Sequence, residues 1–277
     1  AASGDATITS GTSGDAVYTV EIDMLSVSSE GTVYLELDPT GLASDDIEDP
    51  AGNDLAGSTV TSMAYDYDAT APVISIIERT DPTPTAADPY LTNQSTVEFT
   101  VYFDEDVTNV DASDFTLVQA YPASPSVTTI TGVTQFDAQT YMVDVTFASD
   151  ADVSLELDGA NGDIEDMYGN ALTMSLTSDG YRYDGTPPTA TISRDDATPT
   201  NASSVNWSVD WDEDVDNFGD LLGEVNPNFT TTGTVAYSAY TVTQVGADEY
   251  TVEVTGITGD GTISIGIDAG VEDLAGN

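Results

Sequence analysis

Stretches in which apolar and polar side chains alternate occur along the whole chain. Successive side chains of a β-strand point to opposite faces, so this period of two predicts strands with one buried face. The stretches are rich in β-branched and aromatic residues, and clusters of Gly, Pro, Asn and Asp separate them. No segment has the 3.6-residue period of an amphipathic helix, and we therefore expect an all-β protein. The clearest alternating stretches are 17–22, 97–103, 141–145, 250–254 and 263–267.

Three sequence markers recur along the chain in the same order. One reads Ile/Val-Glu-Asp-x-x-Gly-Asn, the second reads Asp-x-Thr-x-Pro, and the third is an aromatic residue followed by Asp-Glu-Asp-Val. Copies of each marker are about 110 residues apart, which is the period expected of tandem modules of one fold. The markers occupy 47–53, 164–170 and 271–277; 68–72 and 184–188; and 103–107 and 211–215.

The markers divide the chain into an N-terminal part (1–68), a middle module (69–184) and a C-terminal module (185–277). The middle module has room for about seven strands, the strand number of an immunoglobulin-like β-sandwich. The N-terminal part matches only the later strands of a module, and the C-terminal module lacks the last strand. The strands expected in the middle module are 73–77, 97–103, 114–120, 127–134, 140–147, 152–158 and 171–183, with a core that includes Phe99, Val101, Phe103, Val143, Val145, Leu155 and Leu157.

The composition excludes several classes of function. The chain has 277 residues with three Lys plus Arg and 50 Asp plus Glu, so its formal net charge is −47. Its only cationic side chains are Arg79, Arg182 and Arg194, which excludes a basic surface for nucleic acid. The absence of His and Cys excludes disulfides, His catalysis and metal sites built on those residues. No apolar run approaches the roughly 18 residues of a membrane-spanning helix, and we expect no membrane insertion.

Together with the strand patterns Tyr-Thr-Val-x-Val at 250–254 and Gly-Thr-Ile-Ser-Ile at 261–265, the markers give the chain a family resemblance. It resembles the bacterial immunoglobulin-like (Big-type) tandem repeats of large cell-surface adhesins and envelope fibres. The resemblance covers essentially the whole chain. It implies an extracellular location, tandem sandwiches arranged as an extended rod, and calcium at the junctions between modules. The extreme acidity and the absence of lysine depart from commoner members of the family.

Acidic residues concentrate where a sandwich of this kind receives its incoming chain. The loop after the second strand and the loop before the last strand lie at that end, next to the linker. Two carboxylates about 4 Å apart repel by about 4 kcal/mol at an effective dielectric of about 20, so such a cluster needs a counter-charge. We expect Ca²⁺, which takes about 6–8 oxygen ligands in irregular geometry, rather than Mg²⁺. The candidate ligands are Asp68, Asp104, Glu105, Asp106, Glu165, Asp166 and the Asn170 carbonyl in the middle module; Asp184, Asp212, Glu213, Asp214, Glu272, Asp273 and Asn277 in the C-terminal module; and Glu48 and Asp49 in the N-terminal part.

A second interpretation of the Glu-Asp-x-x-Gly-Asn marker is conformational. Asp and Asn in tight loops accept hydrogen bonds from backbone N–H groups. Gly52, Gly169 and Gly276 are candidates for turn positions with positive φ. A surface run of Asp can also be no more than solvated charge. The turn and the metal site are compatible roles for the same residues.

The leading functional hypothesis is a structural or adhesive module of an extracellular fibre. Calcium would stiffen the tandem modules within a surface filament, an adhesin stalk or a surface layer, and Pro72, Pro187 and Pro188 restrict the linkers further. The expected partners are neighbouring modules or identical subunits. The incomplete end modules indicate either a segment of a longer repetitive chain or modules that a strand from a neighbouring subunit completes.

The alternative is a ligand-binding adhesin domain with a glycan or a mineral as its partner. Its candidate surfaces are the long loops 80–95 and 119–126. The Tyr-x-Tyr-Asp segments before each linker offer rings for sugar stacking, although one-sided strand packing explains them as well. A glycosidase would use one pair of carboxylates. Because the acidic loops recur in successive modules, whereas a catalytic pair is usually built once, we do not expect an enzyme.

Overall fold

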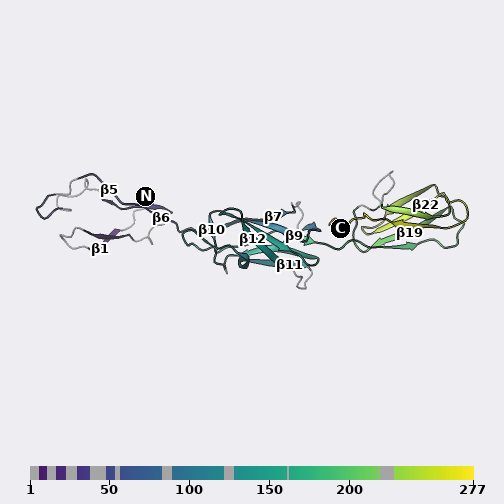
Figure 1. Ribbon diagram of the computed structural model, residues 1–277, viewed down its shortest axis with the longest axis horizontal. Helices are drawn as coiled ribbons and strands as arrows, with labels where there is room; N and C mark the ends of the chain where they lie inside the picture. Colours follow the sequence, from purple (N-terminus) through teal and green to yellow (C-terminus); the bar gives the residue numbers. More distant parts are fainter. Residues whose placement is uncertain are drawn as a thin grey trace.

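The computed structural model describes residues 6–10, 17–22, 30–37, 48–53, 57–82, 89–121, 128–160, 162–216, 218 and 228–277. Every regular element in these ranges is a β-strand except the 3₁₀ turn Ala112–Asp114, so the expectation of an all-β protein is confirmed for them. Figure 1 shows the strands in three groups that follow one another along the longest axis, in the order of the sequence. No helix in the described part of the chain is long and apolar enough to cross a membrane.

Two large sheets form most of the middle module, and one hydrophobic core contains residues from both. All seven residues expected in this core are buried, with at most 4% of each exposed. Burial of each such side chain contributes about 1.5–3 kcal/mol. The four-stranded sheet has the order β12 (Thr129–Gln135), β13 (Thr140–Thr146), β9 (Thr96–Phe103) and β7 (Ile74–Asp81); the five-stranded sheet has the order β11 (Phe115–Tyr121), β14 (Ala151–Asp158), β17 (Tyr181–Tyr183) and β8 (Tyr90–Thr92), with β16 (Ser175–Thr177) also paired to β14.

The end of the middle module differs from the single strand expected over 171–183. The structure has two short strands there, β16 and β17, and a break at 178–180. At the break, Leu155 N donates to the Ser178 hydroxyl at 2.9 Å, so a side chain replaces a ladder carbonyl. A Cβ on Gly180 would lie 3.1 Å from Val153 O, so the close approach of the two backbones favours glycine.

Strand β8 lies inside the segment 80–95 that we expected to be a loop. It pairs in parallel with β17, with Tyr90 opposite Tyr181. Three residues are too few for an alternating pattern to be recognised in the sequence. The parts of the two predicted ligand-binding loops at 83–88 and 122–127 lie outside the described residues.

The C-terminal module repeats the four-stranded sheet, in which β18, β19, β22 and β21 correspond to β7, β9, β13 and β12. Its second sheet has only β20 and β23 among the described residues. We expected one strand to be missing, but the described residues contain no counterpart of β8, β16 or β17. The absence of a counterpart of β8 follows from the absence of a counterpart of β17, because in the middle module β8 pairs only with β17. The bounds are β18 (Ala190–Arg194), β19 (Ser204–Trp211), β20 (Phe229–Gly233), β21 (Ala239–Gln244), β22 (Glu249–Thr255) and β23 (Ile263–Ile267).

The described residues of the N-terminal part form three strand pairs. Gly31 lies opposite Tyr67 in one pair, which is the register that Ala151 and Tyr183 have in the middle module. Large apolar side chains remain exposed here, among them Tyr65 at 77%. The pairs are β1 (Ala6–Ser10) with β2 (Thr19–Ile22), β3 (Gly31–Val33) with β6 (Tyr65–Tyr67), and β4 (Glu36–Leu37) with β5 (Val60–Thr61).

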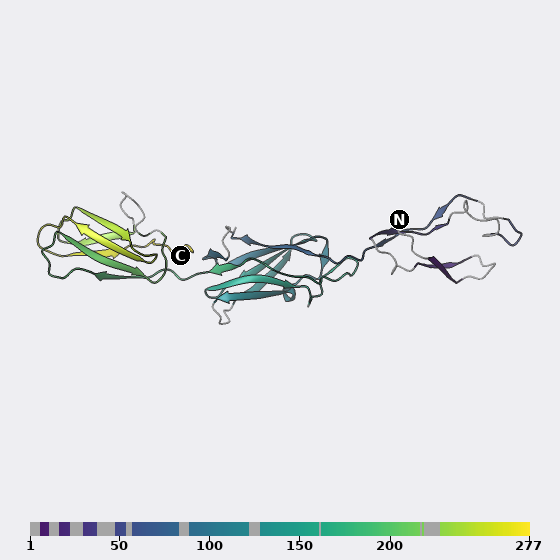
Figure 2. The same ribbon diagram turned by 180° about the vertical axis from the view of Figure 1, so that it is seen from behind.

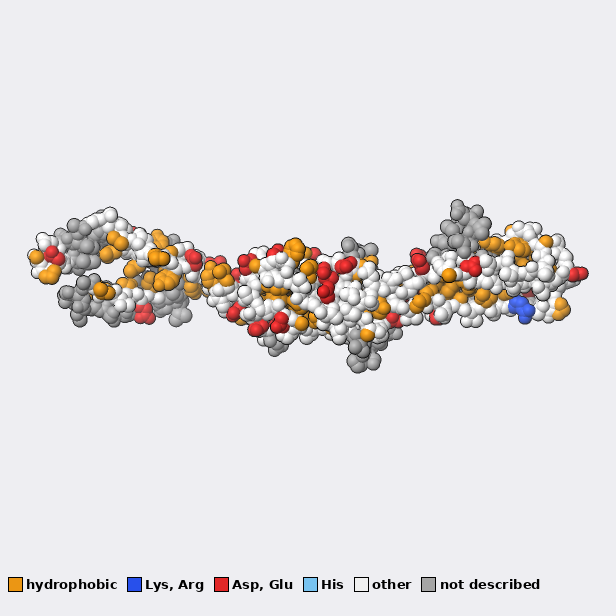
Figure 3. Space-filling view, viewed as in Figure 1, with side chains coloured by type: hydrophobic (Ala, Val, Ile, Leu, Met, Phe, Trp, Pro, Cys, Tyr) orange, Lys and Arg blue, Asp and Glu red, His pale blue; other side chains and the backbone are white. Residues whose placement is uncertain are grey.

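The chain has few cationic side chains, and two of them form ion pairs within the middle module. Figure 3 shows Asp and Glu side chains spread over the middle group and one small basic area, over the C-terminal group. Arg182 forms a bidentate ion pair with Asp152, with Nε to Oδ1 at 2.7 Å and Nη2 to Oδ2 at 2.8 Å. Both residues lie on neighbouring strands of one sheet, β17 and β14. This arginine is therefore engaged within the middle module.

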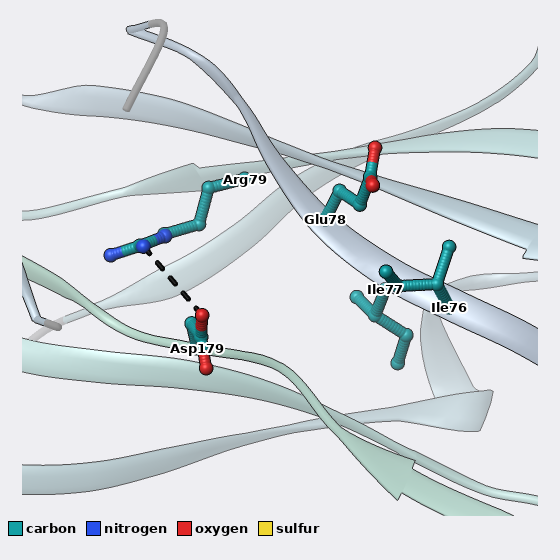
Figure 4. Close-up of a pocket in the computed structure, with 5 residues that line it drawn as sticks. All are labelled: Ile76, Ile77, Glu78, Arg79 and Asp179. Carbon is teal, nitrogen blue, oxygen red and sulfur yellow. Dashed lines mark ion pairs between the residues drawn. The ribbon is translucent and has the colours of Figure 1, made fainter. Parts of the chain in front are cut away.

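Arg79 joins the two sheets of the middle module. It extends from β7 to the turn before β17, where its Nη1 donates to Gly180 O at 2.7 Å and its Nη2 lies 3.7 Å from the Asp179 carboxylate (Figure 4). Its side chain is only 6% exposed, and Cζ lies 5.9 Å from the centre of the Tyr181 ring. A hollow of about 340 Å³ lies beside the ion pair, lined also by residues 76–78. Arg79 is thus a structural contact between layers.

Replacement of Arg79 by Ala is expected to lower the free energy of unfolding of the middle module by about 2 kcal/mol. The substitution removes a charged hydrogen bond and leaves a gap between the sheets. Asp179→Ala should cost less than about 1 kcal/mol, since the Asp179 side chain is 70% exposed. Urea unfolding followed by circular dichroism measures both. Arg194→Ala is the matched control, and a loss as large as that of Arg79→Ala would contradict the assignment.

Candidate metal centres at the two linkers

Two groups of three carboxylates form at the linkers, one at each end of the middle module. The first contains Asp68, Glu105 and Asp166, and the second contains Asp184, Glu213 and Asp273. Within each group, one oxygen from every residue lies within 4.8 Å of the other two. Each group draws one member from the linker, one from the loop after β9 or its counterpart β19 in the next module, and one from that module's Gly-Asn turn. The two groups have the same composition and the same topological origin.

A short strand pair brings the loop and the turn together. β10 (Val107–Thr108) follows the acidic loop and pairs with β15 (Glu165–Asp166), with Val107 opposite Asp166. In the C-terminal module an isolated bridge joins Val215 to Asp273 in the same way. The pairing holds the last residue of the Ile/Val-Glu-Asp sequence beside the loop that carries Glu105 or Glu213. Both Asp166 and Asp273 are buried, with 2% and 3% exposed.

The Asp-x-x-Gly-Asn sequence folds into a turn around the Asp carboxylate. Asp166 Oδ1 accepts hydrogen bonds from Tyr168 N at 2.7 Å and Asn170 N at 2.9 Å. The Asn170 side-chain amide donates to Asp166 Oδ2 at 2.7 Å, and Gly169 has φ +90°. Asp273 makes the equivalent bonds within 273–277, and Asp49 within 49–53. The conformational interpretation of this marker is therefore correct.

The two asparagines tie each turn to the preceding linker. Asn170 Nδ2 donates to Asp68 O at 3.4 Å, and Asn277 Nδ2 donates to Asp184 O at 2.7 Å. The Asn170 carbonyl, which we expected to be a metal ligand, accepts a hydrogen bond from Asp166 N at 3.1 Å. Figures 1 and 2 both place the C-terminal end of the chain at the junction between the second and third groups. The hydrogen bond from Asn277 to the linker therefore lies at that junction.

The remaining acidic candidates lie outside the two carboxylate groups. Asp104 Oδ1 accepts from Val73 N at 2.7 Å, and Asp212 binds Thr189 through both oxygens, so these residues fix the first strand of their modules. Asp106 Oδ1 accepts from the Gln139 amide at 2.9 Å. The others that the described residues do not bring into either group are Glu48, Asp49, Glu165, Asp214 and Glu272.

Burial and mutual repulsion raise the pKa values of the two loop glutamates. Burial is the larger cause for Glu105, followed by the charges of Asp166 and Asp68. Burial and then Asp184 and Asp273 raise the pKa of Glu213 to about 7. Burial opposes ionisation of Asp166 too, but the hydrogen bonds from Asn170 and from the backbone of the turn leave its pKa below the ordinary value. In the first group, the hydrogen bonds thus favour the charged form of Asp166, whereas burial and neighbouring charges oppose ionisation of Glu105.

Glu30 and Asp150, which were not among the expected residues, extend each carboxylate group into the preceding module. The Thr70 hydroxyl donates to Glu30 Oε1, and the Thr186 hydroxyl donates to Asp150 Oδ2 at 2.8 Å. Glu30 contributes to the raised pKa of Glu105, and Asp150 contributes to that of Glu213. An alignment of the matching strands at 31–37 and 151–157 would have revealed the shared acidic residue that precedes both.

Similarity between this chain and known proteins is weak. No protein-family model and no curated protein matches the chain. Among solved structures, the chain matches FdeC, an adhesin of Escherichia coli, with 13% sequence identity and a TM-score of 0.39. The match covers 76% of this chain and 67% of the FdeC chain. A likeness at this level carries no argument about function.

The raised pKa of Glu213 predicts a specific pH dependence in the presence of a chelator. The ordinary pKa is 4.5 and the folded-state value is about 7, so the folded protein binds more protons than the unfolded chain between these values. The melting temperature of the C-terminal module should therefore rise as the pH falls from 8 toward 5. Glu213→Gln should flatten this slope, whereas Asp214→Asn should leave it unchanged. A slope of equal size in the Glu213→Gln protein would contradict this prediction.

Proposed function

We propose that this chain is part of an extracellular structural or adhesive fibre in which Ca²⁺ fixes successive immunoglobulin-like modules in an extended rod. The observation that carries the proposal is the pair of equivalent carboxylate groups, each built from a linker and the module that follows it. A catalytic centre would be expected once, whereas a joint is expected at every linker. The repetition therefore favours a mechanical role.

The charges at each linker favour the binding of a divalent cation. Carboxylates about 4 Å apart repel by about 4 kcal/mol per pair at an effective dielectric of about 20. Arg79 and Arg182 are engaged within the middle module. Every cause that raises the pKa of Glu105 or Glu213 is burial or another carboxylate. A bound cation would offset this repulsion without a basic side chain.

Calcium suits these oxygens better than other common ions. The donors are hard carboxylate oxygens from three separate segments, and calcium tolerates such irregular shells and completes them with backbone carbonyls and water. Magnesium requires stricter octahedral geometry at shorter distances. The turns fix the carboxylates of Asp166 and Asp273, and the linker and loop residues would complete the ligand set.

The mechanical consequence follows from which segments the ion would join. Asp68 and Asp184 belong to the linkers, while Glu105 and Glu213 belong to the following modules. An ion bound to both would fix the angle between modules, in addition to the hydrogen bonds that Asn170 and Asn277 make to the linkers. Without the ion, repulsion would favour separation of the same groups. Calcium would thus convert a flexible series of modules into a stiff spacer between a cell surface and its partner.

Calcium titration of single-site variants tests the proposal. Isothermal calorimetry should detect at least two sites in the full chain. Glu105→Gln should remove the site at the first linker only, and Glu213→Gln the site at the second only. Asp106→Asn, next to Glu105 in sequence but outside the carboxylate group, is the control that should retain both. Binding of calcium to the native state alone stabilises it, so a chelator should lower the melting temperature of the parent protein.

Small-angle scattering gives the mechanical readout of the same samples. We expect the radius of gyration to decrease on chelation, and to do so in the parent protein more than in the double variant of Glu105 and Glu213. No heat of calcium binding, together with an unchanged melting curve and radius of gyration, would refute the proposal.

A further inference from the structure

The end of strand β8 lies at the second linker, beside the end of β17. The two strands run parallel, with Thr92 opposite Tyr183. The pairing continues one step further, because Asp184 N donates to Thr92 O at 3.0 Å. The linker therefore leaves the middle module next to Asn93, the residue that directly follows β8. Asp184 is also the linker member of the second carboxylate group.

Two hydrogen bonds join this end of the middle module to the Asp-x-x-Gly-Asn turn of the C-terminal module. Asn93 Nδ2 donates to Gly276 O at 2.7 Å, and Asn277 Nδ2 donates to Asp184 O at 2.7 Å. The middle module thus supplies one donor and one acceptor, and two successive residues of the turn supply the complementary pair. Together the two bonds restrict rotation about the linker, which a single bond would permit.

The conformation of the turn suits it to this contact. Gly276 has φ +91°, which favours glycine, and a Cβ on it would lie 3.5 Å from Asn93 Nδ2. Asn277 Nδ2 donates to Asp273 Oδ2 at 2.9 Å as well as to the linker. Asp273 Oδ1 accepts from Gly276 N at 2.7 Å. The turn is therefore braced from within where it meets the middle module.

The linker that leads to the C-terminal module is anchored as well. Asp150 Oδ1 accepts from Gly185 N at 2.9 Å, and Asp150 Oδ2 accepts from the Thr186 hydroxyl at 2.8 Å. A Cβ on Gly185 would collide with the hydroxyl of Tyr183. The Tyr183 ring is stacked on Phe147 at a centroid distance of 5.1 Å, so glycine fits here without displacing a packed ring. The first residues of the linker thus belong structurally to the middle module.

We propose that Asn93 and the adjoining ends of β8 and β17 form a calcium-independent docking site for the Asp-x-x-Gly-Asn turn of the module that follows. Docking fixes the angle and the rotation between the two modules, and it places Asp184 beside Asp273, with carboxylate oxygens within 4.8 Å. Repulsion between these carboxylates opposes docking, so the hydrogen bonds determine how many molecules are docked when no cation is bound. Docking of this kind goes beyond the proposed function, because it requires no calcium.

Spin-label distances across the second linker test this docking site. The chain has no Cys, so labels can be placed at Thr129→Cys on β12 and Thr243→Cys on β21, which are exposed strand positions of the two modules. All samples contain a chelator. In the labelled parent we expect a narrow docked distance beside a broad undocked population. Asn93→Ala should lower the ratio of docked to undocked molecules about fivefold, the effect expected for the loss of one hydrogen bond.

A further variant and two controls separate the donor role of Asn93 from other effects. Asn93→Asp keeps the size of the side chain but turns a carboxylate oxygen toward Gly276 O, and should reduce docking at least as much as Asn93→Ala. Gln94→Ala, at the next exposed position, is the matched control and should leave the ratio unchanged. A label pair at Thr61→Cys and Thr134→Cys spans the first linker and should not respond to Asn93→Ala.

Equal ratios in the parent, Asn93→Ala and Asn93→Asp proteins would overturn the proposal. So would a parent protein with no docked population in chelator, because docking would then require a cation. Since no sample contains free calcium, these distances test the docking site separately from the calcium titration, and either proposal can fail without the other.

Discussion

The repulsion among carboxylates at each linker is the constraint on which the account of this protein depends. A chain with 50 acidic and three basic side chains cannot neutralise its clusters with its own cations. Asp and Glu side chains are spread over the visible face of the middle group, where water and salt screen their charges (Figure 3). At the linkers the fold brings acidic side chains together, because the β10–β15 pair and the equivalent bridge between Val215 and Asp273 hold one loop and one turn against the incoming chain. The clusters are therefore a product of topology, and they recur wherever the topology recurs.

One short sequence performs two tasks at these sites. The Asp of the Asp-x-x-Gly-Asn turn accepts hydrogen bonds from the Asn side chain and from the backbone of the turn, and in Asp166 these bonds hold the pKa below the ordinary value despite burial. The Asn of the same turn reaches the linker backbone and fixes the position of the incoming chain. The turn thus provides both an anchored anion and a tether. The conformational interpretation is compatible with the proposed metal site, because the turn fixes the position of the carboxylate that would be a ligand.

The sequence predicted the parts of the fold that depend on local pattern. The alternation of apolar and polar residues identified core residues of the middle module such as Phe99 and Leu157. A strand that is buried on one face has an apolar side chain at every second position. This alternation could not predict β8, which has three residues and exists because β17 lies beside it. The break between β16 and β17 depends on a hydroxyl of Ser178 that replaces a ladder carbonyl, and a sequence pattern does not show such a replacement.

The candidate sites, like the fold, could be predicted only in part from the sequence. The repeated markers identified the loops that converge, but they did not distinguish Glu105 from Asp104 and Asp106, whose carboxylates differ only in the directions they take in three dimensions. Glu30 and Asp150 were overlooked since they lie in the preceding module, where no marker of their own accompanies them. The partner of Arg79 was also invisible in sequence, because it is separated from Arg79 by 100 residues and by a change of sheet.

Anomalous scattering from crystals grown with calcium shows directly whether the ion occupies the linkers. We expect one anomalous peak at each linker, about 2.3–2.6 Å from carboxylate oxygens of Asp68, Glu105 and Asp166, or of Asp184, Glu213 and Asp273. Ordered carboxylates at both linkers with only water between them, in crystals saturated with calcium, would contradict this expectation.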